Sequence, residues 1–295
     1  MNLLLNVVFG LFLLTCNGKV EKQPQIKPES NTPISIPVEE EMASIANDSL
    51  PEPESDTAFE TAPPEAKPEA TQKKVIVEDT PLNDKIWERL LKKHVDDKGN
   101  VNYIGFKGDI NELEVYLSHM AQNPPKSVWS KNEKLAYYIN LYNAATVKLI
   151  VDHYPVKSIK DIPNRWKKKW IKVGDGITSL NDIEHEVLRQ MNEPRIHFAI
   201  NCASYSCPKL LNIPFTPQSM ERLLSKTAVD FVNDKSRNKF ENGSAQLSRI
   251  FKWYKGDFTE DATLLEYINQ YLENPVDKNA KVVYLDYDWS LNETE

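Results

Sequence analysis

The sequence predicts an α+β fold, a single mixed domain with several helices around a small sheet. All six tryptophans lie beyond residue 80, and only this part of the chain has the aromatic residues that build a core. Within it, segments with helical periodicity alternate irregularly with short segments typical of strands. Irregular alternation of this kind favours α+β over a repeating βαβ architecture.

Each element follows from periodicity and from its capping or turn residues. Helical spacing of apolar residues predicts helices at 84–94, 109–120, 131–153, 180–190, 217–232 and 263–272. Ser130 and Glu133 form a capping box before the longest of these helices. Short β-type segments predict strands at 101–103, 167–173, 177–180, 195–202 and 247–251. Gly174, Asp175 and Gly176 indicate a hairpin turn between the second and third strands.

The N-terminal residues predict export. The apolar run from Leu3 to Leu14 is shorter than the roughly 20 residues that span a bilayer, and is typical of a signal peptide. Its end, Leu13 to Cys16, resembles a bacterial lipobox, so residues 1–16 are interpreted as a lipoprotein signal peptide. We expect an exported protein, anchored in the bacterial cell envelope by lipid on Cys16, with the membrane as its first partner.

Residues 17–80 are expected to form a disordered Pro/Glu-rich tether. They contain nine prolines and a single aromatic residue, and such a composition cannot bury enough apolar surface to offset chain entropy. They also carry a net charge of −8, which leaves +1 for the rest of the chain. A nearly neutral domain gives no general case for nucleic acid binding, which needs clustered positive charge.

Asn140 and Asn143 lie three residues apart on one face of the longest predicted helix. Asparagine is unfavourable inside a helix because its amide competes for backbone hydrogen bonds, so both side chains need partners. One interpretation is that they bond a neighbouring loop in the core, as buried polar groups normally do. The alternative is that one amide orients an imidazole or donates to an oxyanion.

Residues 195–210 contain the side chains best suited to chemistry. In a strand at 195–202, Cys202 would face the core with Phe198, and His197 would lie on the other face about 13 Å from Asn201. Cys207 falls in a turn, where we expect an exposed thiol near His197. With Cys16 carrying lipid, Cys202 and Cys207 also form a candidate disulfide pair, expected to be oxidised in an exported protein.

The chain resembles the family called domain of unknown function 547 over residues 84–292. The resemblance is carried by motifs at residues 138–144, 179–189, 197–208, 250–258 and 287–292. It implies the limits of the domain and brings no established reaction. It also singles out His185, whose alternatives are a capped or core histidine and a catalytic one.

Two further features complete the pattern. His197, Cys202 and Cys207 are each five residues apart, which is not a recognised zinc spacing, and no metal or cofactor is expected. A basic and aromatic run at residues 165–172 is typical of a solvated strand face, and alternatively of contact with anionic lipid or an acidic envelope polymer.

These observations leave two functions open. The first is a binding or scaffolding module with a structural Cys202–Cys207 pair. The second is a thiol-dependent hydrolase or acyl transferase acting on an envelope peptide or amide. Its nucleophile would be Cys207, its base His197, and its orienting group Asn140 or Asn143, with His185 as a further candidate.

Overall fold

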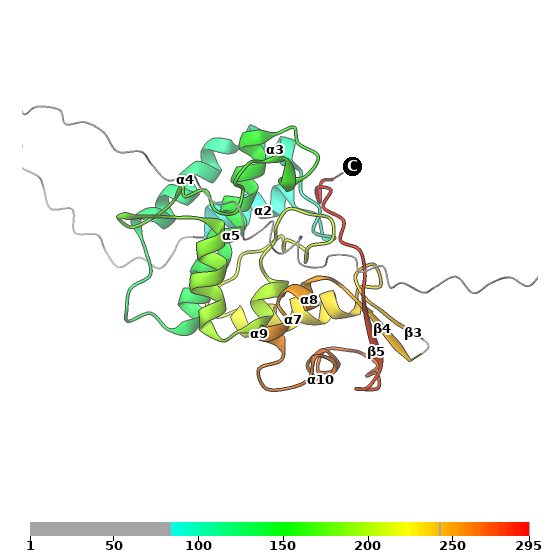
Figure 1. Ribbon diagram of the computed structural model, residues 1–295. Coiled ribbons are helices and arrows are strands. Elements are labelled where there is room, and N and C mark those ends of the chain that lie inside the picture. Colours follow the sequence, from blue (N-terminus) through cyan, green and yellow to red (C-terminus); the bar gives the residue numbers. More distant parts are fainter. Residues whose placement is uncertain (1–83, 242, 295) are drawn as a thin grey trace, which may run out of the picture. The chain divides into compact units, whose positions relative to one another are not determined.

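The computed structural model describes residues 84–241 and 243–294 (Figure 1). The signal peptide at 1–16 and the tether at 17–80 lie outside the described residues and remain predictions. The described part is a mixed α+β domain, as predicted from the sequence. None of its helices combines the length and apolar character needed to cross a membrane.

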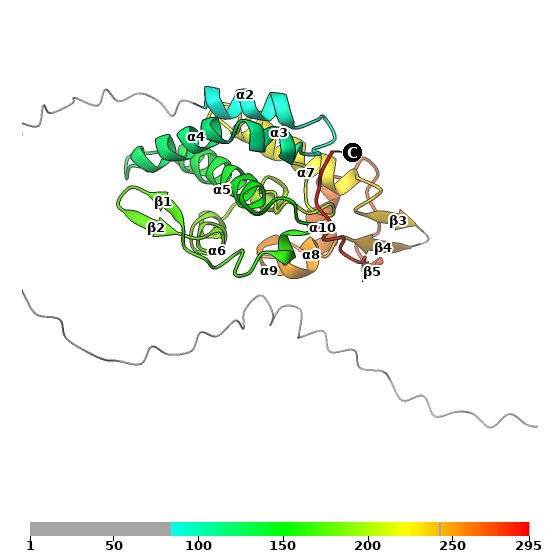
Figure 2. The ribbon, with the colours of Figure 1, turned by 90° about the horizontal axis from the view of Figure 1, so that it is seen from above.

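The first half of the domain is helical and packs around α5. Helices α2 (Lys85–His94), α3 (Tyr103–Gly108) and α4 (Ile110–Gln122) precede α5 (Lys131–His153), and α4 lies along α5 (Figure 2). The predicted capping box at Ser130 and Glu133 is present, and it satisfies the free amides at the start of α5. Nearly every residue from 135 to 151 is buried, so α5 is the central helix of the domain.

The predicted hairpin follows. Strands β1 (Ile171–Val173) and β2 (Gly176–Thr178) pair antiparallel, with Gly174 at a positive φ in the turn. Ser179 then caps a helical stretch made of α6 (Leu180–Asp182), the π-helix η2 (Ile183–Leu188) and the 3-10 turn η3 (Arg189–Met191). In Figure 2 the hairpin lies at one end of the domain, away from the second sheet.

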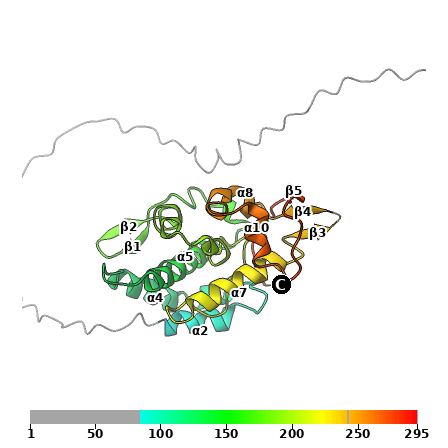
Figure 3. The ribbon, with the colours of Figure 1, turned by 90° about the horizontal axis from the view of Figure 1, so that it is seen from below.

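The second half has its own apolar cluster. Helix α7 (Met220–Asn233) is followed by β3 (Lys239–Glu241) and β4 (Ser244–Leu247), and then by α8 (Ile250–Trp253), α9 (Lys255–Phe258), α10 (Leu264–Asn269) and β5 (Lys281–Tyr284). Strand β4 pairs antiparallel with β3 and parallel with β5 (Figure 3). Phe198, Phe231, Phe251 and Phe258 pack together at the centre of this cluster.

The C-terminal segment ties distant loops together. After β5 it makes isolated β-bridges from Ser290 to Ser158, from Leu291 to Ser204 and from Glu293 to Val101. Asn292 is buried within it and accepts a hydrogen bond from the Tyr103 hydroxyl at 2.7 Å. The segment therefore holds the loop that carries the two cysteines against the helical half.

Two predicted strands are wrong, and a third is misplaced. Residues 101–103 make only single bridges at Val101, because Asn102 caps α3 and Tyr103 already belongs to that helix. Residues 195–202 begin instead with the 3-10 helix η4 (Pro194–Phe198), which has proline in its first turn. The strand expected at 247–251 covers only the end of β4, and Ile250 and Phe251 lie in α8. The side chains of residues 195–202 therefore do not alternate between two strand faces, as the sequence analysis had expected for Cys202 and His197.

Candidate functional site

The two cysteines lie at the ends of a short loop that Asn201 holds in shape. The Asn201 side chain accepts the Ala203 N–H at 2.8 Å and donates to the Pro208 carbonyl at 2.7 Å. Ala203 has a φ of 60°, in the left-handed region of backbone conformations that residues other than glycine and asparagine rarely adopt. One buried amide thus fixes both ends of the loop around Cys202 and Cys207.

The sulfurs of Cys202 and Cys207 are 2.8 Å apart, so the predicted pair is brought together, but both residues are free thiols in the structure and the expected disulfide is not formed. The Cys207 thiol donates to the Cys202 sulfur and accepts the backbone N–H of Cys202 at 2.9 Å. The predicted exposures of the two residues are wrong. Cys207 is buried, with 6% of its surface exposed, whereas Cys202 is only half-buried, because residues 195–202 do not form the strand whose alternation was expected to place Cys202 in the core.

This arrangement separates the acidities of the two thiols. The hydrogen bond from Cys207, with further bonds from Ser204 and Tyr287, outweighs desolvation and lowers the pKa of Cys202 to about 7. Burial and the neighbouring Cys202 sulfur raise the pKa of Cys207 well above its ordinary value. Cys202 is therefore the thiol that ionises first, although Cys207 was the residue expected to do so.

Tyr287 and Ser204 complete the surroundings of the Cys202 sulfur. The Ser204 hydroxyl lies 3.1 Å and the Tyr287 hydroxyl 3.4 Å from that sulfur, and the two hydroxyls are 2.9 Å apart. Tyr287 comes from the C-terminal segment, where its ring packs against Trp253 and Trp289. A thiolate at Cys202 is thus stabilised by hydroxyl groups whose positions depend on long-range packing.

His197 belongs to a separate network. It is 3% exposed, its Nε2 lies 2.8 Å from Asp257 Oδ2, and its ring stacks on Tyr254 with centroids 3.9 Å apart. Arg189 binds both oxygens of Asp257, at 2.7 and 2.6 Å, and its third nitrogen lies 2.8 Å from His185 Nδ1. The predicted candidates His185 and His197 are thus joined through Arg189 and Asp257.

Charge and burial oppose each other in this network. Burial lowers the pKa of His197, although the hydrogen bond to Asp257 acts in the other direction. Burial would raise the pKa of Asp257, but the hydrogen bonds from Arg189 and His197 prevail and hold it well below its usual range. The second ring nitrogen of His197, Nδ1, is buried and has no hydrogen-bond partner among the described residues.

Asn140 and Asn143 both bond loop backbone, the first of their two predicted interpretations. Asn140 donates to the Phe215 carbonyl at 2.8 Å and accepts the N–H of the same residue at 3.0 Å. Asn143 donates to the Ala199 carbonyl at 3.0 Å and accepts the Asn201 N–H at 2.8 Å. Asn143 therefore supports the loop that carries the thiols, and Asn140 supports the segment before α7.

The structure does not assemble the predicted set of nucleophile, base and orienting group. None of the contacts described for His197, Asn140 or Asn143 is made to a cysteine sulfur. The partners that the sequence analysis missed are Arg189, Ser204, Asp257 and Tyr287. The motifs at 179–189, 197–208, 250–258 and 287–292 contain them, but no local pattern assigns them a contact.

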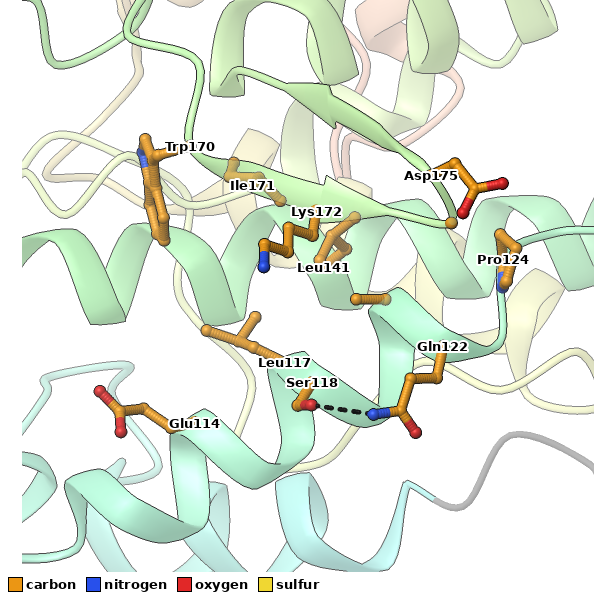
Figure 4. A pocket seen from close by; sticks show the side chains of 12 residues that line it. Glu114, Leu117, Ser118, Gln122, Pro124, Leu141, Trp170, Ile171, Lys172 and Asp175 are labelled. Carbon is orange, nitrogen blue, oxygen red and sulfur yellow. Dashed lines mark hydrogen bonds between the residues drawn. The ribbon is translucent and has the colours of Figure 1, made fainter. Parts of the chain in front are cut away.

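An open groove, whose lining includes neither cysteine, lies between α4 and the hairpin (Figure 4). Its volume is about 920 Å³, and its lining mixes apolar side chains such as Leu117 and Trp170 with charged ones such as Glu114 and Lys172. Within residues 84–241 and 243–294, no three His, Cys, Asp or Glu side chains converge in a way that could hold a metal ion.

The central part of this chain is similar to a known family. Residues 126–232 match the DUF547 model, described as a protein of unknown function. The DUF547 match includes both cysteines and all the predicted histidine and asparagine candidates, and it ends before Asp257 and Tyr287. No curated protein and no solved structure matches the chain. The DUF547 match thus supports the family resemblance over its central part and assigns no reaction.

Proposed function

We propose that the domain is a thiol–disulfide exchange module, with Cys202 as the attacking thiol and Cys207 as the resolving thiol. The observation that carries the proposal is the pair itself, two free sulfurs 2.8 Å apart of which one is half-buried and the other buried. Exchange needs an accessible thiolate and a second thiol within reach of the resulting mixed disulfide. The partial exposure of Cys202 together with its lowered pKa provides the first, and the position of Cys207 provides the second.

The exchange proceeds in two displacements. The Cys202 thiolate, whose proton has gone to water, attacks one sulfur of a partner disulfide and releases the other sulfur as a thiolate. Cys207 then attacks the Cys202 sulfur, and its proton goes to the departing partner thiolate. The partner disulfide gains two electrons and becomes a dithiol, while the cysteine pair loses two electrons and becomes a disulfide.

A thiol-dependent hydrolase or acyl transferase has less support from the same geometry. Acyl transfer needs a base in contact with the nucleophile and donors aimed at the developing oxyanion. His197 is committed to Asp257 and stacks on Tyr254, and it makes no described contact with either sulfur. The amides of Asn140 and Asn143 are both occupied by loop backbone.

A binding or scaffolding module with a structural disulfide is the second candidate. It is favoured by the clamp that Asn201 places on both ends of the loop, since a fixed loop suits a permanent bond. Closing so short a loop would add about 2 kcal/mol in the chain-entropy model. In this case the pair would stabilise the loop and take no part in electron transfer.

The location follows from the N-terminal pattern. The run from Leu3 to Leu14 followed by Cys16 supports an exported protein that lipid on Cys16 anchors in the cell envelope, with residues 17–80 as the tether. Disulfides persist in such compartments, so a partner disulfide on an envelope peptide or protein would be available there. Mass analysis of the mature N-terminus tests this part, and a soluble product cleaved elsewhere would contradict it.

Trapping the mixed disulfide tests the exchange. The reduced full chain, carrying Cys16→Ser to leave only two thiols, is treated with oxidised glutathione. Cys207→Ser should accumulate a stable glutathione adduct at Cys202, because the resolving thiol is missing. The chain with both thiols should release the glutathione and close its own disulfide. Cys202→Ser, which keeps only the buried Cys207, should form a glutathione adduct much more slowly than Cys207→Ser does.

The reduction potential of the Cys202–Cys207 pair distinguishes an exchange site from a structural disulfide. We expect a potential above about −300 mV in glutathione buffers, within the range of exchange proteins. A potential below that value, with no adduct on Cys207→Ser, would reject exchange in favour of the structural pair.

A further inference from the structure

Three aromatic rings pack together beside the Cys202 sulfur. The Tyr287 ring centroid lies 4.8 Å from that of Trp253 and 4.6 Å from that of Trp289, and the two indoles are 5.7 Å apart. The Tyr287 hydroxyl is 3.4 Å from the Cys202 sulfur. We propose that this aromatic cluster selects the exchange partner, a polypeptide disulfide with an aromatic or large aliphatic residue next to a half-cystine. This selectivity presupposes the exchange activity proposed above.

The aromatic cluster is partly exposed, unlike the rings of the core. Trp253, Tyr287 and Trp289 are each half-buried, as is Cys202. Phe251, two positions before Trp253 in α8, is completely buried. Helix α8 thus places one ring in the core and the other at the surface, where a partner of Cys202 would meet it.

Backbone contacts fix the aromatic cluster relative to the thiols. The Ser290 carbonyl accepts the Tyr205 N–H at 2.6 Å. The Asp288 carbonyl accepts the Ser206 N–H at 3.1 Å, and the Asp288 N–H donates to the Ser206 hydroxyl at 2.9 Å. The backbone on both sides of Trp289 is therefore bonded to the loop between the two cysteines.

Two further contacts hold the aromatic cluster before any partner binds. The Lys160 ammonium lies 5.2 Å from the Trp289 ring centroid, within the range of a cation–π contact. Arg249 donates to the Leu285 carbonyl at 3.2 Å, which ties the start of α8 to the C-terminal segment. A surface that is ordered in advance loses little conformational freedom on binding.

The exchange reaction itself brings a partner over the aromatic cluster. Its first displacement requires bonding contact between a partner sulfur and the Cys202 sulfur, which Tyr287 already touches. Consecutive Cα atoms are about 3.8 Å apart, so the side chain next to the partner half-cystine can reach the rings. An aromatic or aliphatic side chain gains by leaving water and packing on them. Glutathione has no such side chain and would use the sulfur contact alone.

Competing disulfides test the proposal. The reduced full chain with Cys16→Ser is mixed with a disulfide-linked peptide dimer that has phenylalanine before each cysteine, with the same dimer carrying serine there, or with oxidised glutathione. Mass analysis follows closure of the Cys202–Cys207 disulfide, and each rate is divided by the rate of the same disulfide with dithiothreitol. We expect the phenylalanine dimer to react about tenfold faster than the serine dimer, the effect of one aromatic packing contact.

Variants locate this preference on the protein. Trp253→Leu and Trp289→Leu each remove one ring, so the ratio of the two peptide rates should fall toward one. A change in the reactivity of Cys202 cancels in that ratio. Trp129→Leu is the matched control, because Trp129 is also half-buried but packs against Tyr137 outside the aromatic cluster, and it should keep the tenfold ratio.

The outcomes separate selectivity from exchange. A ratio near one in the parent protein, or an unchanged ratio in both cluster variants, would overturn the selectivity, and a reaction with glutathione would still support exchange. Reaction with none of the three disulfides would reject exchange, and the selectivity with it.

Discussion

Asn143, in the middle of the central helix, accepts the backbone N–H of Asn201 at 2.8 Å. Asn201 in turn clamps the loop that brings Cys202 and Cys207 together. The position of the reactive thiol therefore depends on a chain of buried amides that begins in α5. This chain connects the stability of the fold to the chemistry of the site.

Replacing Asn143 by alanine should affect both stability and reactivity. Asn143→Ala leaves the Ala199 carbonyl and the Asn201 N–H without partners, and each unsatisfied buried group costs about 1–3 kcal/mol. Urea denaturation of the reduced protein measures the loss. Asn140→Ala is the matched control, because it removes the same contacts from Phe215 instead. Both variants should lose stability, and only Asn143→Ala should change the rate of Cys202 alkylation. Equal alkylation rates in Asn143→Ala and Asn140→Ala would show that the contact between Asn143 and Asn201 does not position the thiol.

Removing the Tyr287 hydroxyl should raise the pKa of Cys202. The hydroxyl stabilises the thiolate by a hydrogen bond, and such a bond to a charged group is worth about 1.5–3 kcal/mol, or about one to two pKa units. The ultraviolet absorbance of the thiolate, followed against pH, measures the shift in Tyr287→Phe. Tyr284→Phe, in β5, is the control. An unchanged pKa in Tyr287→Phe would mean that the hydroxyl does not donate to the sulfur.

Acid should destabilise the domain through His197 and Asp257. The pKa of His197 is lowered in the fold, so the unfolded chain takes up its proton first and stability falls as the pH drops below about 6.5. The pKa of Asp257 is also held low, so its stabilisation is complete above about pH 4 and is lost as the pH falls further.

Thermal unfolding from neutral pH down to about pH 3 measures this dependence. Asp257→Asn should have a lower midpoint at neutral pH and a weaker dependence at acid pH, since the titrating carboxylate is gone. Asp286→Asn, at a fully exposed carboxylate, is the control. If the thermal midpoint of Asp257→Asn equalled that of the parent protein at every pH, the stabilising role given to the Arg189, Asp257 and His197 network would be wrong.

Local sequence signals predicted the elements whose determinants are local. The α5 helix has its own capping box, and the hairpin has its own glycine turn, so both appear where expected. The segment at 195–202 failed because alternating apolar residues also suit a short helix, and Pro194 with the Asn143 clamp decides the backbone there. Periodicity carries no information about that tertiary contact.

Some residues of the site could be predicted from the sequence, but the contacts between them could not, because these contacts are tertiary. Cys202, Cys207 and His197 stand out by residue type, so the sequence alone identifies them. Their relationships depend on Asp257 and Tyr287, which lie at least 50 positions further along the chain and reach the site only through long-range packing. The exposures of the two thiols were exchanged because the turn at Ala203 could not be foreseen from spacing.

Mapping alkylation of the reduced protein tests the central claim most directly. The full chain with Cys16→Ser is exposed briefly to iodoacetamide across a range of pH, and the modified peptides are identified by mass. The account predicts that Cys202 is labelled first, with a midpoint near pH 7, while buried Cys207 reacts only when the protein unfolds. Labelling of Cys207 ahead of Cys202 in the folded protein would contradict it.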